Sequence, residues 1–270
     1  MTYQEYLKEK KKDLVAMIHL AALPGTPKNS LAPCEIMKKA VEEAKLYQNA
    51  GIKTVMIENM HDVPYTKTVG PEVTATMANV AKAVKDLGLY CGVQVLAGCN
   101  KEALAIAHSA SLDFVRVEGF VFGHLGDEGL FDSCAGELLR YRRLIGAENV
   151  LVFTDIKKKH SSHALTADIS LPETATAADF FCSDGVIITG TSTGEAVSLE
   201  ELRALRPNPI RKLIGSGLTK DNLPQFFPLA DIFIVGSHLK VDGSWENSPS
   251  PDRVRDFVKI FNDLQDNSSE

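Results

Sequence analysis

The sequence has few cysteines, and none of them are spaced as a metal or redox pair. It contains five, an odd number, and no Cys-x-x-Cys motif. This pattern argues against a disulfide framework and against a thiolate zinc site. It favours a reducing compartment, because free thiols persist there.

The chain also lacks a long apolar run, a targeting signal and positive net charge. No apolar stretch reaches the length of a membrane span. The first 13 residues mix lysines with acidic residues, so we expect neither a secretory signal nor a transit peptide, and the location predicted is cytoplasmic. An organellar form derived from a longer precursor is also compatible with the sequence. The net charge of −6 argues against nucleic acid or an anionic membrane as a partner.

Short apolar segments alternate along the chain with segments of helical periodicity. The eight predicted strands lie at 14–19, 53–58, 90–96, 113–118, 150–155 and 185–189, and within 211–219 and 231–239. Regular alternation predicts an α/β fold with a parallel sheet and right-handed crossovers. The count of eight predicts closure into a (β/α)8 TIM barrel. An open doubly wound sheet is the alternative, but no Gly-x-Gly-x-x-Gly motif opens a helix after the first strand.

The predicted barrel is a single domain of residues 14–266. Residues 1–13 are predicted as an N-terminal extension and residues 267–270 as a C-terminal tail. Residues 119–133 and 156–170 are predicted to be loops. Asn100 is expected to cap the Ala-rich helix that follows the third strand.

The last two predicted strands end in similar Gly-Ser turns. Glycine at a strand exit lets the backbone approach a ligand, and Thr219 is expected to cap the next helix. In a (β/α)8 barrel such turns form a phosphate site after strands seven and eight. The predicted phosphate-binding residues are Gly215, Ser216, Gly217, Gly236, Ser237, Thr189 and Gly190. The loop 190–194 is predicted to be a lid or a flexible connection. The alternative is two ordinary turns that use glycine.

Polar residues at the ends of several other strands are expected to point into the same mouth. The catalytic candidates are His19, Glu58, Glu118, Asp155, Lys157 and His160, and the substrate-binding candidates are Asn59, Gln94 and Arg116. Period-two alternation places Arg116 and Glu118 on one face of their strand, and Asp155 and Lys157 on one face of theirs. The alternative is that ion pairs such as Arg116–Glu118 only stabilise the top of the barrel.

A divalent metal is a possible cofactor, although the sequence requires none. Asp155, His160 and His163 are the candidate ligands, although their spacing matches no strong metal signature. A mobile basic loop is the alternative for this segment.

Six segments together resemble one known family. They are 19–25 (HLAALPG), 58–64 (ENMHDVP), 137–143 (ELLRYRR), 154–160 (TDIKKKH), 188–194 (ITGTSTG) and 235–240 (VGSHLK). They resemble the BtpA family, and the resemblance implies a TIM barrel of the ribulose-phosphate-binding type. The chain departs from the family pattern Val-Asn-Val-Leu-Arg-Asn at 93–98, which reads VQVLAG, so a substrate common to all members does not follow.

Two hypotheses of different classes follow from the sequence. The first is a soluble enzyme, an isomerase, lyase or hydrolase, that uses acid–base chemistry on a phosphorylated sugar or nucleotide-like compound. The second is a non-catalytic assembly or stability factor, which the family's association with photosystem I biogenesis implies. Self-association into a homo-oligomer is possible in either case.

Overall fold

Eight parallel strands form the centre of the molecule in the computed structural model, which describes residues 1–10, 12–158, 160–190 and 197–267. These strands are β1 (Asp13–His19), β2 (Thr54–Glu58), β3 (Tyr90–Gln94), β4 (Phe114–Val117), β7 (Leu151–Asp155), β9 (Gly185–Ile188), β10 (Lys212–Ile214) and β11 (Ile232–Val235). The α-helices are α1 (Tyr3–Lys10), α2 (Pro33–Asn49), α3 (Pro71–Lys85), α4 (Asn100–Ser109), α5 (Ala135–Leu144), α6 (Leu171–Phe180), α7 (Leu199–Ala204), α8 (Leu223–Phe226) and α9 (Pro251–Asn267). Short 3-10 helices are η1 (Ala164–Thr166), η2 (Phe227–Leu229), η3 (Ser237–Leu239) and η4 (Val241–Gly243).

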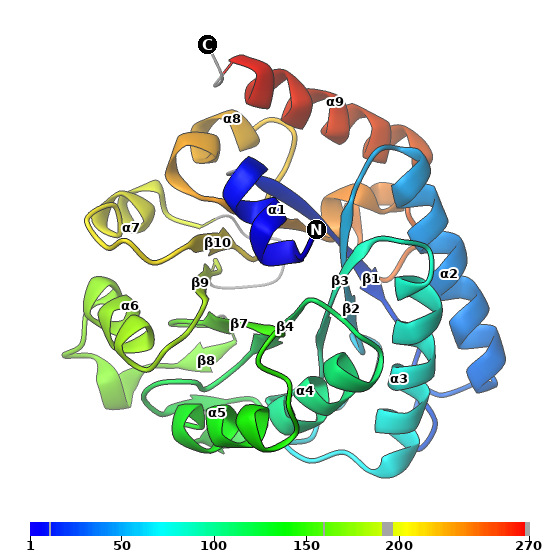
Figure 1. Cartoon of the computed structure of the whole chain (residues 1–270), viewed down its shortest axis with the longest axis horizontal. Coiled ribbons are helices and arrows are strands. Elements are labelled where there is room, and N and C mark those ends of the chain that lie inside the picture. Colours follow the sequence, from blue (N-terminus) through cyan, green and yellow to red (C-terminus); the bar gives the residue numbers. More distant parts are fainter. Residues whose placement is uncertain (11, 159, 191–196, 268–270) are drawn as a thin grey trace.

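The strands close into a ring in the order β1-β11-β10-β9-β7-β4-β3-β2. Closure is direct, because β1 pairs in parallel with both β2 and β11. Helices surround the ring (Figure 1). The predicted (β/α)8 TIM barrel is therefore confirmed. No helix in the described part of the chain is long and apolar enough to cross a membrane.

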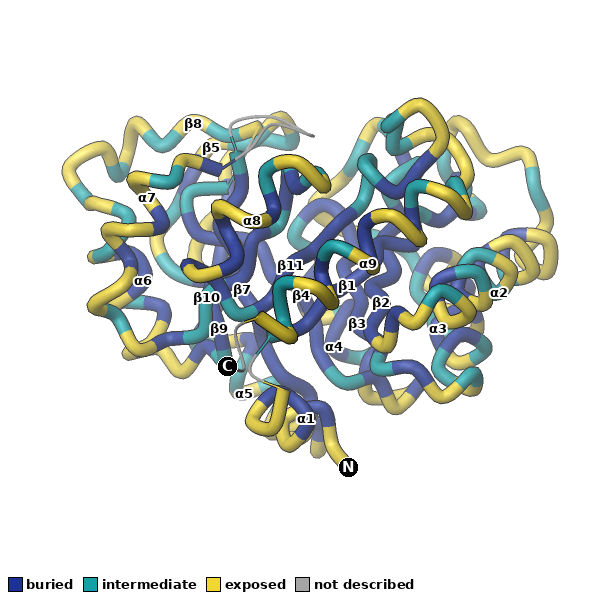
Figure 2. Tube along the Cα trace, turned by 90° about the horizontal axis from the view of Figure 1, so that it is seen from above, coloured by how far each residue is buried: buried dark blue, intermediate teal, exposed yellow. Residues whose placement is uncertain are grey.

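Two segments predicted as loops contain strands instead. Strands β5 (His124–Gly126), β6 (Gly129–Phe131) and β8 (Ser161–Ser162) form a small antiparallel sheet in the order β6-β5-β8. Figure 2 places β5 and β8 at the end of the molecule opposite α1. Strands of two or three residues are too short for an apolar alternation, and the glycines around them are typical of loops.

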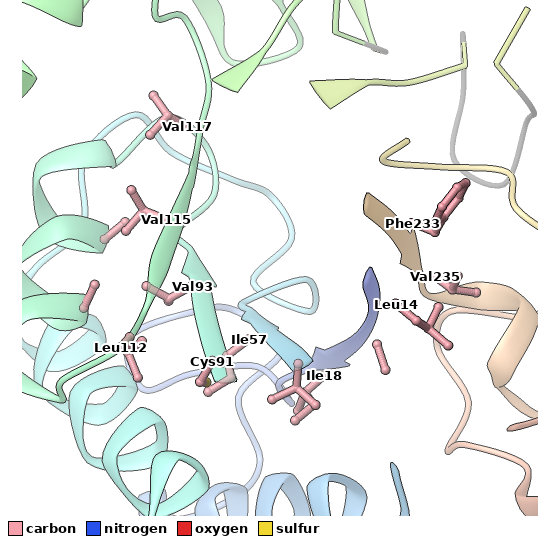
Figure 3. Packing of buried hydrophobic residues seen from close by; sticks show 14 of the residues in the cluster. Leu14, Ile18, Ile57, Cys91, Val93, Leu112, Val115, Val117, Phe233 and Val235 are labelled. Atoms are coloured by element: carbon pink, nitrogen blue, oxygen red, sulfur yellow. The ribbon is translucent and has the colours of Figure 1, made fainter. Parts of the chain in front are cut away.

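Side chains alternate between the two faces of each barrel strand, and both faces are buried. Outward-facing residues such as Leu14, Ile18, Val93 and Val115 belong to the core between strands and helices (Figure 3). A second cluster, which includes Met17, Met56, Phe114 and Phe153, fills the barrel interior. Strands covered on both faces favour the continuous apolar runs seen in this sequence.

Helix α1 covers the N-terminal ends of the strands and lies over the centre of the ring in Figure 1. Its Tyr3 and Tyr6 are buried, and the Tyr3 ring stacks on Phe114 with centroids 5.3 Å apart. The Tyr3 hydroxyl donates a hydrogen bond of 2.7 Å to Asp13 at the start of β1. One end of the barrel is therefore closed, and the cavity described below lies at the other.

Candidate functional site

A cavity of roughly 500 Å³ occupies the C-terminal end of the barrel. Its wall includes residues at or just after the ends of seven of the eight barrel strands, all except β9. These residues are His19, Glu58, Gln94, Arg116, Asp155, Gly215 and Gly236. Each lies two residues after an inward-facing position of its strand and therefore also points inward, one layer above the apolar interior. The strand pattern therefore places polar side chains and glycines together at this end.

Arg116 and Asp155 form a bidentate ion pair across β4 and β7. Nε and Nη2 of Arg116 donate to the two oxygens of Asp155 at 2.8 and 2.9 Å. Burial acts to lower the pKa of Arg116, but the charge and hydrogen bonds of Asp155, with Glu58 and Glu118 nearby, raise it above its ordinary value. The guanidinium is thus charged, and only two of its five N–H groups are used by Asp155. Arg116 also lines the cavity, so its charge acts on what the cavity binds.

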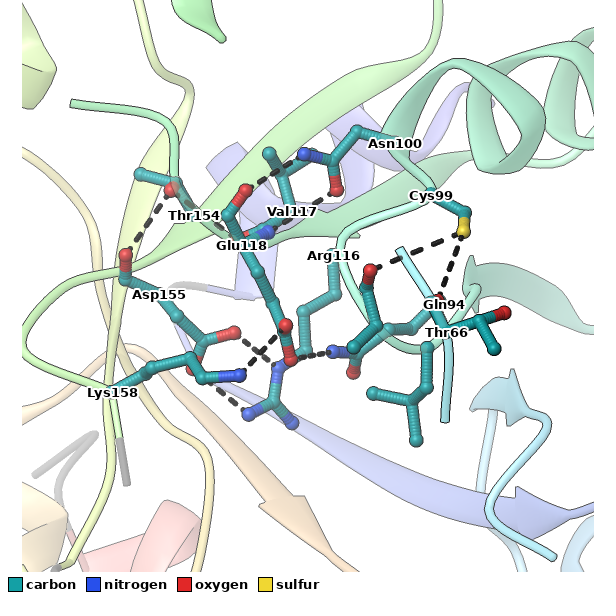
Figure 4. Close-up of polar contacts among 12 residues, drawn as sticks. Thr66, Gln94, Cys99, Asn100, Arg116, Val117, Glu118, Thr154, Asp155 and Lys158 are labelled. Atoms are coloured by element: carbon teal, nitrogen blue, oxygen red, sulfur yellow. Dashed lines mark hydrogen bonds and ion pairs between the residues drawn. The ribbon is translucent and has the colours of Figure 1, made fainter. Parts of the chain in front are cut away.

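Glu118 sits between two donors beside this pair (Figure 4). Gln94 Nε2 donates to its Oε1 at 3.0 Å, and Lys158 Nζ contacts its Oε2 at 2.8 Å. Asn100 holds the Glu118 backbone through two further hydrogen bonds. Asn100 is therefore the first residue of α4 and not its cap, contrary to the prediction, because its side chain is engaged with the neighbouring strand.

His19 and Glu58 form a second pair, at the ends of the adjacent strands β1 and β2. His19 Nε2 lies 3.7 Å from Glu58 Oε2, and Nδ1 lies 3.2 Å from the carbonyl oxygen of Trp245. A carbonyl only accepts, so Nδ1 carries hydrogen. The Nε2 atom then either carries a proton toward Glu58 or takes one from it, which is the arrangement of an acid–base pair.

The turns after β10 and β11 line the cavity wall near His19. Gly215, Ser216 and Gly217 come from the first turn, and Gly236 and Ser237 from the second. A Cβ on Gly215 would lie 2.5 Å from Ile187, and Gly217 has φ +71°, so both positions favour glycine. A Cβ on Gly236 would lie 3.3 Å from the His19 ring and would narrow the site.

The cationic side chain of Arg253 stands beside these turns. Arg253, in the first turn of α9, donates from Nε to the His238 carbonyl at 2.7 Å, and both residues line the cavity. Burial lowers the pKa of His238, as does the charge of Arg253. The wall near the Gly-Ser turns therefore combines backbone, hydroxyl and guanidinium groups, a set that suits an oxyanion.

The helix expected to start at Thr219 starts later. Thr219 and Asn222 bond to each other across a turn, and α8 begins at Leu223 and has four residues. Thr219 therefore lines the cavity as part of a turn and does not cap a helix. Any anion site here depends on the turns themselves.

Most of the predicted site residues line the cavity, but five do not. His19, Glu58, Gln94, Arg116, Glu118, Asp155, His160 and the five residues of the two Gly-Ser turns do line it. Lys157, Asn59, Thr189, Gly190 and His163 are not part of its wall. Asn59 is fully buried and ties the loop after β2 to Leu96 and Asp62. The Gly190 N–H donates a hydrogen bond of 2.9 Å to Ser216 Oγ and so helps to hold the turn after β10 in place.

The lysine that faces the cavity is Lys158, not Lys157. Strand β7 ends at Asp155, and Lys157 has φ +48°, so the alternation that predicted its direction no longer applies. Its Nζ donates to Thr166 instead. The predicted Arg116–Glu118 pair is also wrong, because each residue binds a partner on another strand or loop.

The proposed metal ligands are divided between two cavities. His160 lines the large one, whereas His163 lines a small neighbouring one and contacts the Lys158 carbonyl through Nε2. Among the residues that the structure describes, no three His, Cys, Asp or Glu side chains are grouped to hold a metal ion. The predicted lid at 190–194 falls largely on residues 191–194, outside the described part.

Several cavity residues were not predicted from the sequence. They are Tyr65, Asp127, Glu128, Lys158, Thr219, His238, Trp245 and Arg253. Trp245 is the single tryptophan of the chain and lies in a polar segment of the sequence. A large aromatic residue in such a segment could have indicated a binding site. The others are set by loop paths and long-range packing, which no local pattern encodes.

Comparison with known families and sequences gives a consistent result. The model of the BtpA family matches residues 10–263. An uncharacterised mitochondrial protein of Caenorhabditis elegans is 47% identical over 257 residues, which covers 92% of each chain. An uncharacterised protein of Pyrococcus furiosus is 35% identical over 94% of this chain and 96% of its own. The photosystem I biogenesis protein BtpA of Synechocystis is 30% identical over 92% of this chain and 87% of its own.

Solved structures resemble the fold at low sequence identity. Thiamine phosphate pyrophosphorylase from Pyrococcus furiosus superposes with a TM-score of 0.58 at 15% identity, covering 96% of this chain and 98% of its own. Phosphoribosyl anthranilate isomerase from Thermus thermophilus gives 0.57 at 13% identity, covering 93% and 99%. These similarities establish the barrel architecture and no more.

Proposed function

This chain belongs to the BtpA family, and from that premise we propose that it is an enzyme acting by acid–base chemistry on a phosphorylated sugar or nucleotide-like compound. One observation carries the proposal. Inward-facing polar side chains at the ends of five strands meet in one cavity, together with two glycine-rich turns. Convergence of this kind at the C-terminal end is how TIM-barrel enzymes build active sites.

The phosphate is assigned to the turns after β10 and β11. Gly217, Gly236 and Ser237 supply backbone N–H groups, Ser216 supplies a hydroxyl, and Arg253 lies within the same wall. The named ligands of the two structural neighbours, a thiamine phosphate and a phosphoribosyl compound, support this class of ligand by analogy of fold. The analogy gives no substrate.

Proton transfer is assigned to His19 and Glu58. One of them removes a proton from the substrate and the pair returns it, while Arg116 and Lys158 stabilise the oxygen on which negative charge develops. An isomerase or lyase uses this sequence of events directly. A hydrolase would use the same pair to activate water.

Thermal shift against a panel of phosphorylated metabolites tests the ligand class. A true ligand at a hundredfold its dissociation constant adds about 2.7 kcal/mol to the free energy of unfolding. Once a substrate is found, Glu58→Gln should lower turnover by about 10²- to 10⁴-fold while substrate affinity changes little. Glu137→Gln, the same change at an exposed position on α5, is the control. No shift with any phosphorylated compound would refute the proposal.

The second candidate is a non-catalytic assembly factor, which the name of the Synechocystis relative supports. The two candidates differ in what they require of the cavity. The double variant Asp155→Asn with Lys158→Ala changes the cavity, whereas Lys157 would be the wrong lysine because it binds Thr166. If circular dichroism shows the variant to be as well folded as wild type, an assembly factor should still complement a strain that lacks its own family member, and an enzyme should not.

Location, self-association and metal use also remain proposals. We place the protein in a reducing compartment, cytoplasmic or, by analogy with the mitochondrial relative of Caenorhabditis elegans, organellar. Cell fractionation tests the first. Size-exclusion chromatography with light scattering tests the homo-oligomer, and titration with Mg²⁺ tests a divalent metal.

A further inference from the structure

The geometry points to Gln94 as the residue that selects the substrate. We propose that its side-chain oxygen accepts a hydrogen bond from a hydroxyl group of a phosphorylated polyol, at the end of the molecule remote from the phosphate. The inference rests on the proposed function and narrows its substrate class from phosphorylated compounds in general to polyol phosphates.

The orientation of the Gln94 amide is fixed by its neighbour. Its nitrogen, Nε2, lies 3.0 Å from Glu118 Oε1. Glu118 forms an ion pair with Lys158, whose Nζ lies 2.8 Å from its other oxygen. An ionised carboxylate only accepts hydrogen bonds, so the amide nitrogen must face it. Gln94 Oε1 is therefore directed elsewhere.

That oxygen is buried, and it has no hydrogen-bond partner among the described residues. Gln94 is 1% exposed, yet it lines the cavity. Buried polar atoms are normally hydrogen-bonded, so the partner of this acceptor comes from the cavity contents. A donor group of the ligand supplies it in the complex.

The position of Gln94 in the ring places this acceptor across from the proposed phosphate site. Strand β3 is separated from β10 by three strands in either direction around the barrel, β4, β7 and β9 one way and β2, β1 and β11 the other. A ligand whose phosphate lies at the Gly215–Thr219 turn therefore presents its far end to Gln94. The cavity of roughly 500 Å³ is within the usual range for a small-molecule site.

The wall around Gln94 favours neutral donors over charged groups. The carboxylates of Glu58 and Glu118 lie close to Tyr65 in this wall, and burial together with these charges raises the Tyr65 pKa. A second anion is disfavoured there. Arg116 and Lys158 already balance part of that negative charge, so a cationic amine is not required. Hydroxyl groups satisfy amide and carboxylate acceptors alike.

Isothermal titration with three classes of probe tests the inference. The probes are inorganic phosphate, pentose and hexose phosphates, and analogues of the best binder that each lack one hydroxyl. The variant Gln94→Met keeps the length of the side chain without its amide, and Gln48→Met on α2 is the matched control. We expect phosphate to bind wild type and Gln94→Met within twofold. The best polyol phosphate should bind Gln94→Met about 10- to 100-fold more weakly.

One deoxy analogue should reproduce the loss in the wild-type protein and show no further loss in Gln94→Met. If Gln94→Met does not fold, the deoxy series on wild type decides alone, and the inference is overturned if no single deletion weakens binding more than threefold. It is also overturned if phosphate binds but polyol phosphates bind no tighter. Failure of phosphate and of every sugar phosphate to bind would instead remove the proposed function itself.

Discussion

At the closed end of the barrel Asp13 is buried between two tyrosines, whereas at the open end Asp155 is buried against an arginine. Asp13 accepts hydrogen bonds from the hydroxyls of Tyr3 and Tyr6 and from the Leu14 N–H. Burial raises its pKa to about 6 in spite of these donors. Both carboxylates belong to strands of the same ring. Asp13 is the first residue of β1, and Asp155 is the last residue of β7.

The two ends of the barrel differ in whether their buried polar groups can also contact a ligand. The donors around Asp13 are used internally, and α1 shields them. Arg116 donates two of its five N–H groups to Asp155 and also lines the cavity. Burying a charged group costs stability. A barrel end that buries several charged side chains around a cavity is therefore organised for binding.

The largest effect on stability is expected from breaking the open-end pair. Arg116→Met leaves Asp155 buried without its cation and should lower the free energy of unfolding by roughly 3–5 kcal/mol. The double variant Arg116→Met with Asp155→Leu should recover most of that loss, because no unpaired charge remains. Urea unfolding of the single and double variants measures both. A double variant as unstable as the single one would contradict the argument.

At the closed end the expected effect depends on pH. The folded pKa of Asp13 is about 6 and its ordinary value 3.8, so its stabilising contribution is present below about pH 4 and is lost as the pH rises through 6. Relative to Asp13→Asn, wild type should lose about 2 kcal/mol of unfolding free energy between pH 4 and pH 7. Chemical unfolding of both proteins across this range measures it. Parallel pH profiles would show that Asp13 is not shifted.

His124, in strand β5 at the open end, should give the opposite sign. Burial, with Lys158 and His163, lowers its pKa to about 4, below the ordinary value of 6.5. Its contribution is present above pH 6.5 and is lost as the pH falls to 4. Relative to His124→Phe, which keeps the ring that stacks on Phe131, wild type should lose roughly 2 kcal/mol over that range. The measurement is again unfolding against pH, and a loss in the alkaline direction would contradict it.

The features that could be predicted from the sequence are those that depend on neighbouring residues in the chain. Period-two alternation placed Arg116 and Glu118 on one face of their strand, and the position of Gln94 near the end of its strand placed it in the same mouth. The structure brings all three to one cavity. The eight alternating units predicted the barrel, because each βα unit is recognisable on its own. These features need no knowledge of which segment contacts which.

What the sequence could not predict depends on contacts between distant segments. The partner of Arg116 is Asp155 on the neighbouring strand, 39 residues away, and it is selected by the register between β4 and β7. Lys158 replaced Lys157 because the chain leaves the strand geometry after Asp155. Arg253 reaches the cavity from the last helix only because the barrel closes. Local periodicity carries no information on any of these.

The smallest expected effect comes from one hydroxyl at the closed end. Tyr6→Phe removes the 3.2 Å hydrogen bond to Asp13 and should cost about 1 kcal/mol at pH 7, where the carboxylate is ionised. At pH 4 the cost should shrink, because a protonated Asp13 accepts a weaker hydrogen bond. Tyr90→Phe is the control, since its ring lies 4.8 Å from that of Tyr6 and the change leaves the bonds to Asp13 in place. Phosphate affinity should stay unchanged in both variants, and a loss of affinity in Tyr6→Phe would mean that the two ends of the barrel are coupled.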